Sequence, residues 1–99
     1  MKMIYITSNI SVFPQVREML DTLMIDSYQV IERAWSKSPK GDKRFDDPVW
    51  PGYNVIIFVQ TDNNNCLKIT SKLKIINDNA HNDNELITWA EWSLDKLNS

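Results

Sequence analysis

The sequence lacks several features that would place it at once in a large functional class. It has a single cysteine, Cys66, so one chain can form neither an internal disulfide nor a metal site made only of cysteines. It also lacks an excess of basic residues, because 11 Lys and Arg stand against 13 Asp and Glu, for a net charge of −2. This balance argues against a nucleic-acid-binding module, whose affinity needs a basic face.

Long hydrophobic runs are missing as well. The apolar stretch at the N-terminus, residues 1–8, is far too short for a signal peptide or a membrane span. The 99 residues, 42% hydrophobic and 24% charged, have the composition of a soluble globular protein and allow one domain, residues 1–99. We expect a cytoplasmic protein with a modest core, to which association with partners would add stability.

The apolar pattern alternates between strand-like and helix-like segments. Short β-branched and aromatic runs predict four strands, over residues 3–7, 28–35, 54–60 and 86–92. Apolar residues at three- and four-residue steps predict a first helix, capped by Ser11 and ended by residues 26–27. A second helix is expected to start at residues 62–64 and to reach Ile76, and the asparagine-rich residues 77–84 are expected to form a polar loop.

The order β-α-β-β-α-β predicts a ferredoxin-like fold of the α+β class, a four-stranded antiparallel sheet with both helices on one face. The third predicted strand is apolar at every position from residue 55 to residue 59, so apolar side chains point to both faces of the sheet. Two helices cover only one face, so Ile56 and Phe58 need another subunit to cover them, and we expect an oligomer. Three tryptophans are expected to anchor the core or a subunit interface: Trp35, Trp89 and Trp92.

The connection between the second and third predicted strands, residues 36–53, is the most unusual segment. Antiparallel neighbours usually join through short loops, and structureless loops beyond about 12–15 residues are uncommon unless they are functional or disordered. One interpretation is a solvated hairpin tip without a function. The other is an arm that responds to a ligand or binds a partner.

The charged side chains of this connection are the best candidates for binding an anionic ligand. They are Lys40, Lys43 and Arg44, with Arg44 first because its planar guanidinium can bind a carboxylate or a phosphate through two bonds. Trp50 lies between two prolines, where a large aromatic side chain can fix the arm or cover a cleft. The alternative is that the cations are solvated and balanced by the three aspartates of the loop, Asp42, Asp46 and Asp47.

Gly41 and Arg44, followed by the sequence Val-Trp-Pro-Gly-Tyr-Asn over residues 49–54 and an apolar strand, resemble the P-II-like signalling proteins. The resemblance fits the whole chain, including the order of the elements and the place of the long loop. It implies a non-enzymatic regulatory homotrimer that senses a small molecule in clefts between subunits and contacts a target protein through the loop. The predicted ligand-binding residues are Lys40, Lys43, Arg44, Trp50, Gly52 and Asn54.

Two departures place the chain with divergent members of that family. The nitrogen-regulatory P-II proteins carry a modifiable tyrosine in the loop, and this chain has none between Ser36 and Val49. They also have a glycine-rich segment that holds phosphate before the last strand, whereas residues 77–84 contain no glycine. Divergent relatives regulate transporters or metal handling, so a membrane transporter is one kind of target that the resemblance implies. The sequence identifies neither the ligand nor a cofactor.

Other functions are compatible with the same order of elements. The main alternative is a metal-binding protein of the divalent-cation-tolerance type, which shares the trimeric fold. His81, Asp83 and Glu85 could form a weak metal site, although ordinary surface polarity explains them better. An RNA-recognition domain needs aromatic residues on its third strand, which offers only Phe58. An enzyme comes third, and a Ser-His nucleophilic pair is unsupported because His81 is the only histidine and lies in the predicted polar loop.

Overall fold

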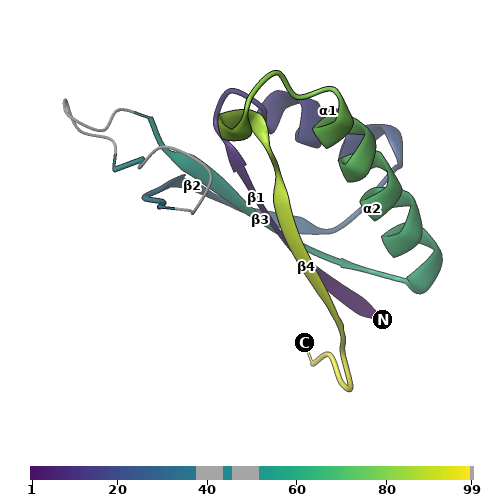
Figure 1. Cartoon of the computed structure of the whole chain (residues 1–99). Helices are drawn as coiled ribbons and strands as arrows, with labels where there is room; N and C mark the ends of the chain where they lie inside the picture. The colour runs from purple at the N-terminus through teal and green to yellow at the C-terminus, as the bar shows by residue number, and fades with distance from the viewer. Residues whose placement is uncertain (38–43, 46–51, 99) are drawn as a thin grey trace.

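The structure is a computed structural model, and it describes residues 1–37, 44–45 and 52–98. Its elements confirm the predicted order β-α-β-β-α-β, with one added turn of 3-10 helix before the last strand (Figure 1). They are β1 (Lys2–Asn9), α1 (Phe13–Thr22), β2 (Tyr28–Ala34), β3 (Asn54–Thr61), α2 (Asn63–Asp78), η1 (Asp83–Glu85) and β4 (Thr88–Ser93). No helix of the described residues is long and apolar enough to cross a membrane.

The four strands form one antiparallel sheet in the order β2-β3-β1-β4, and both helices lie on the same face of it (Figure 1). This is the predicted ferredoxin-like architecture. Tyr5 of β1 stands opposite Phe58 of β3 on one side and opposite Ala90 of β4 on the other. Residues that stand opposite each other share a face, so this row lies on the face that no helix covers.

The core lies between the sheet and the two helices. The side chains of β1 and β3 that point to the helices alternate with those that point away, as a period of two requires. Burial of each of these aliphatic side chains stabilises the fold by about 1.5–3 kcal/mol. The fully buried aliphatic residues are Ile4, Ile6, Val16, Leu20, Val55, Ile57, Val59, Ile69 and Leu73.

The first helix differs from the prediction at both ends. Ser11 does not cap it, because the N-cap position is Val12, which makes no side-chain capping bond. The C-terminal end comes before residues 26–27, since Met24 adopts a left-handed conformation with φ of 57°. The N–H of Ile25 then donates to the carbonyl of Leu20 at 3.1 Å, which closes the helix in a Schellman motif and directs Ile25 into the core.

The second helix starts as predicted, since the carboxylate of Asp62 accepts a hydrogen bond from the N–H of Asn65 at 2.7 Å. The prediction of a loop over residues 77–84 is wrong at its start, because α2 continues to Asp78. The side-chain amide of Asn77 both accepts from the N–H of Ile87 (2.7 Å) and donates to its carbonyl (2.9 Å). Asn77 therefore acts as a strand partner for Ile87, and β4 begins one residue later, at Thr88.

Candidate functional site

The candidate site lies at the end of the sheet where β2 runs into the long connection. The pairing of β2 with β3 shifts between Ile31 and Ala34, and Arg33 adopts a left-handed conformation with φ of 60°. Beyond this irregularity, Ser36 and Arg44 form an antiparallel bridge in which each N–H donates to the other's carbonyl at 2.7 Å. These two bonds fix the base of the connection.

Arg44 turns its side chain inward from this bridge. Its Nη1 donates to Oδ1 of Asn54 at 3.2 Å, and its Nη2 donates to the carbonyl of Asn84 at 2.7 Å and to Oδ1 of the same residue at 3.2 Å. Only 8% of Arg44 is exposed, so it is not a solvated surface charge. A buried guanidinium is stable only where hydrogen bonds satisfy it, and these oxygens contribute to that.

Polar side chains from three other elements surround this guanidinium. Asn54 is the first residue of β3, and its amide donates to the hydroxyl of Thr7 in β1 at 3.4 Å. Asn9, the last residue of β1, donates to the carbonyl of Asn84 at 3.5 Å. Asn84 itself belongs to η1, just before β4. Arg44 therefore connects the base of the long connection directly to β3 and η1, and Asn54 and Asn84 extend this network to β1. We refer to Arg44, Asn54 and Asn84 as the arginine cluster.

The structure brings together two of the six residues that were predicted to bind a ligand, Arg44 and Asn54. Gly52 precedes β3 and has a φ of +87°, a conformation that L side chains rarely adopt. Among the described residues other than its chain neighbours, no atom lies within 4 Å of the position that a Cβ would take. Backbone geometry therefore explains this glycine, rather than close contact with a neighbour. Lys40, Lys43 and Trp50 lie outside the described residues.

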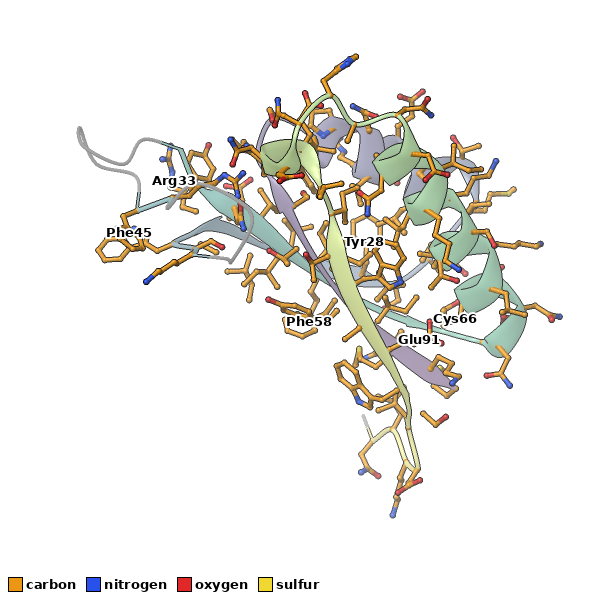
Figure 2. The ribbon with its side chains drawn as sticks, viewed as in Figure 1. Tyr28, Arg33, Phe45, Phe58, Cys66 and Glu91 are labelled. Carbon is orange, nitrogen blue, oxygen red and sulfur yellow. The ribbon has the colours of Figure 1, made fainter. Side chains whose placement is uncertain are left out.

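Aromatic side chains flank the base of the connection. The guanidinium carbon of Arg33 lies 4.7 Å from the centre of the Tyr53 ring, a cation–π contact. On the two strands of the Ser36–Arg44 bridge, the rings of Trp35 and Phe45 lie 6.1 Å apart. Figure 2 shows Arg33 and Phe45 at this end of the molecule, far from Cys66 and Glu91. Trp35 is 73% exposed in the single chain, which is compatible with an interface role and excludes a place in the core.

The lone cysteine lies at the opposite end of the molecule. The Sγ atom of Cys66 in α2 is 3.5 Å from Oε2 of Glu91 in β4 (Figure 2). Burial raises the pKa of the Cys66 thiol, and the negative charge of Glu91 and the hydrogen bond to its carboxylate raise it further. The thiol therefore stays protonated at neutral pH, the form that is a poor nucleophile and a poor metal ligand.

The possible metal ligands of the 81–85 segment have other contacts. A carboxylate oxygen of Glu85 accepts from the backbone N–H of His81 at 2.6 Å. Within residues 1–37, 44–45 and 52–98, no three His, Cys, Asp or Glu side chains form a group that could hold a metal ion.

Several residues at or beside the site were not predicted from the sequence, Asn84 and Arg33 among them. Asn84 was assigned to a loop without a role, and only the abundance of asparagine there signalled that side chains bond to the backbone. Arg33 gave no signal, because a left-handed conformation at a residue other than glycine cannot be read from a sequence pattern.

Comparison with known proteins identifies the architecture. No protein-family model matches the chain. No curated protein matches it either. Among solved structures, it is similar to one from Thermus thermophilus described as a "putative PII-like signaling protein", with a TM-score of 0.66 over 92% of this chain and 83% of that chain.

The chain has the PII-like fold. The identity to the Thermus protein is 14%, so the likeness concerns the fold alone. This likeness in fold agrees with the family resemblance that residues 41–54 indicate. The two observations are independent, because one compares three-dimensional structures and the other compares a short sequence motif. The arginine cluster lies at the base of the long connection of this PII-like fold.

Proposed function

We propose that the protein is a regulatory protein of the cytoplasm, without enzymatic activity, that binds a small anionic ligand at Arg44 and acts on a target protein through residues 36–53. The observation that carries this proposal is the position of Arg44. Its backbone fixes the base of the long connection, while its guanidinium bonds to β3 and η1. A ligand that takes over this guanidinium therefore changes the support of the connection.

The chemistry of the cluster favours an anion as that ligand. The three bonds from Arg44 to Asn54 and Asn84 end on amide and carbonyl oxygens. A hydrogen bond between neutral groups contributes about 0.5–1.5 kcal/mol, and one that involves a charged group about 1.5–3 kcal/mol. A carboxylate or phosphate carries the opposite charge and can accept from both nitrogens of the guanidinium fork at once, which an amide oxygen cannot do. Such an anion competes directly with the oxygens of Asn84.

The remaining predicted ligand residues are assigned to the same site. Lys40 and Lys43 belong to the connection and would add positive charge. Trp50 would cover the ligand, and Gly52 would set the turn that leads from Trp50 into β3.

We infer that the chain forms a homotrimer through the face of the sheet that no helix covers. This face includes Ile31, which is 51% exposed, and Trp92, which is 44% exposed. Tyr5 and Phe58 lie between them, with ring centres 5.5 Å apart. An exposed sheet face of this composition is typical of a subunit interface. Binding of the ligand between subunits would then place the arginine cluster beside a neighbouring chain.

A thermal-shift titration tests the ligand class. We expect ATP, inorganic pyrophosphate or succinate to raise the unfolding midpoint by several degrees, since a ligand that binds only the folded state stabilises it. Arg44→Gln should abolish the shift. Arg44→Lys should reduce it, because an ammonium keeps the charge but lacks the planar pair of N–H donors that binds a carboxylate or phosphate through two parallel bonds. Lys74→Gln, which removes a cation from the outer side of α2, is the matched control and should leave the shift unchanged.

One further variant and one further titration sharpen the test. Asn84→Ala removes an acceptor that competes for Arg44, so it should tighten binding of the active anion. Titration with MgCl2, ZnCl2 and CuCl2 tests the divalent-cation-tolerance alternative. A shift with a metal and none with any anion would favour that alternative and overturn the proposal.

A further inference from the structure

The two helices leave a groove between them at the surface. It encloses a volume of about 330 Å³. On one side its apolar lining comes from Met19, in the C-terminal half of α1, and from Leu23, which follows that helix. On the other side it comes from Ile75 and Ile76 in α2. Ile75 is 52% exposed, so apolar surface remains in contact with water here. The groove lies on the helix layer, away from the arginine cluster and away from the sheet face inferred to bind other subunits.

The two walls of the groove carry opposite charges. α1 contributes the carboxylate of Glu18, and α2 contributes the ammonium group of Lys72. Within the part of the chain that the structure describes, neither side chain forms a salt bridge or a hydrogen bond. The groove therefore presents an apolar floor between one negative and one positive wall.

We propose that this groove is a docking site for an amphipathic helix of a partner protein, with acidic residues on the flank that faces α2 and basic residues on the flank that faces α1. Each wall charge would then gain an opposite charge, and the apolar stripe of the partner helix would cover Met19, Leu23 and Ile75. Like charges against either wall would repel, so the two walls select the charge pattern of the partner.

A partner helix of about three turns would match the length of α1, which forms one wall of the groove. α1 has 10 residues, which corresponds to a length of about 15 Å. Gln15 and Ile76 also line an adjoining hollow of about 80 Å³ that reaches His81 and Glu85, so the depression continues along the helix layer. A partner helix would bind through side chains at positions i, i+3, i+4 and i+7.

Three synthetic peptides of about 15 residues test the proposal. All share one leucine stripe at helical spacing. The first has one acidic and one basic flank, the second has two acidic flanks, and the third has two basic flanks. We expect the first to bind the full-length protein about fivefold more tightly than either of the others, as measured by fluorescence anisotropy.

Single charge reversals should change which peptide binds best. Lys72→Glu makes both walls acidic, so the peptide with two basic flanks should become the tightest. Glu18→Lys makes both walls basic and should favour the peptide with two acidic flanks. Lys74→Glu makes the same change in charge on α2 but outside the groove, so it should keep the wild-type order. Circular dichroism checks that each variant keeps its fold.

Two results would overturn the proposal. One is that no peptide binds at millimolar concentration, or that all three bind equally to the wild type and to both variants. The other is that Lys72→Glu or Glu18→Lys changes the sedimentation coefficient of the protein alone, which would make the groove a contact between copies of this chain. Neither result bears on Arg44, so the proposed ligand site is tested separately.

Discussion

The two faces of β3 belong to the same strand, yet their surroundings differ. Val55, Ile57 and Val59 point to the helices and are completely buried. Ile56 and Phe58 point the other way and remain partly exposed, because no element of the described chain covers them. Figure 2 shows Phe58 on the side of the sheet away from the helices. The helices thus cover one face of the sheet, whereas apolar side chains on the other face stay in contact with water in the single chain.

Burial of an apolar residue in this sheet therefore depends on whether its side chain faces the helices, and not on its hydrophobicity alone. The covered face obtains its stability within one chain. Under the proposed association, the open face gains its stability from neighbouring subunits, so its contribution should depend on protein concentration.

The largest effect is expected for truncation in the covered face. Ile57→Ala should lower the free energy of unfolding by about 2–5 kcal/mol, because it removes buried methyl groups and leaves a cavity. This loss should not depend on protein concentration. Ile56→Ala on the other face is the matched change, and its cost should be small in dilute protein and grow as concentration rises. Urea denaturation at two protein concentrations measures both. Equal, concentration-independent losses would contradict the difference between the faces.

A charge on the open face should prevent association. Phe58→Glu places a carboxylate in the centre of that face, and burying an unpaired charge between subunits is costly. We expect the wild type to sediment as an oligomer at micromolar concentration and the variant as a single species of 11.6 kDa. Leu67→Glu makes the same change at an exposed position of α2 and should leave the mass unchanged. A wild type that sediments only as the 11.6 kDa species would disprove the inferred trimer.

A moderate effect is expected at the boundary of the covered face. Asn77→Ala removes the side chain that bonds both the N–H and the carbonyl of Ile87, a buried residue. Leaving these groups without partners should cost about 1–3 kcal/mol in the free energy of unfolding. Asn79→Ala loses one exposed bond to the carbonyl of Ile75 and should cost about 0.5 kcal/mol or less. Thermal and urea unfolding of the two variants compares them directly.

The smallest effect concerns pH at the other edge of this face. The pKa of Cys66 is raised, first by burial and then by Glu91, so the unfolded chain releases the thiol proton at lower pH than the folded protein does. The stabilisation is complete below about pH 8.5, the ordinary pKa of a thiol, and is lost as pH rises through the raised value.

This pH effect can be isolated by difference. As the pH rises above about 8.5, the free energy of unfolding of the wild type should fall by more than that of Cys66→Ala. Glu91→Gln removes the neighbouring charge, so its thiol should react faster with a thiol-specific reagent at about pH 8 than the wild-type thiol does. Asp95→Asn, a change of the same kind beyond the end of β4, should not alter the rate. Identical rates for all three would contradict the role assigned to Glu91.

Features of the structure that depend on residues close together in the sequence were predicted correctly. The continuous apolar run of β3 and the capping carboxylate of Asp62 were both readable, because side-chain period and hydrogen bonding to near neighbours act within a few residues. The end of α1 at Met24 and the continuation of α2 through Asn77 were not. The first depends on burial of Ile25, and the second on a bond to Ile87, which is 10 residues away in the chain.

For the candidate site, the sequence indicated Arg44 by its residue type and Asn54 through the motif of residues 49–54, but not that the two side chains are in contact. A guanidinium in a charged loop is equally compatible with solvent and with a binding site, and only its surroundings distinguish the two. Asn84 lies 40 residues after Arg44 in the sequence, and the fold brings the two together because η1 lies next to the base of the long connection.

The sequence by itself determined the order of strands and helices and the presence of apolar side chains on both faces of the sheet, since periodicity fixes which residues share a face. The tertiary structure decided which face the helices cover, that Arg44 is buried rather than solvated, and that opposite charges line the groove between α1 and α2. The physical reason is that these properties depend on contacts between residues far apart in the chain. Such contacts form only when the packed sheet and helices bring those residues together.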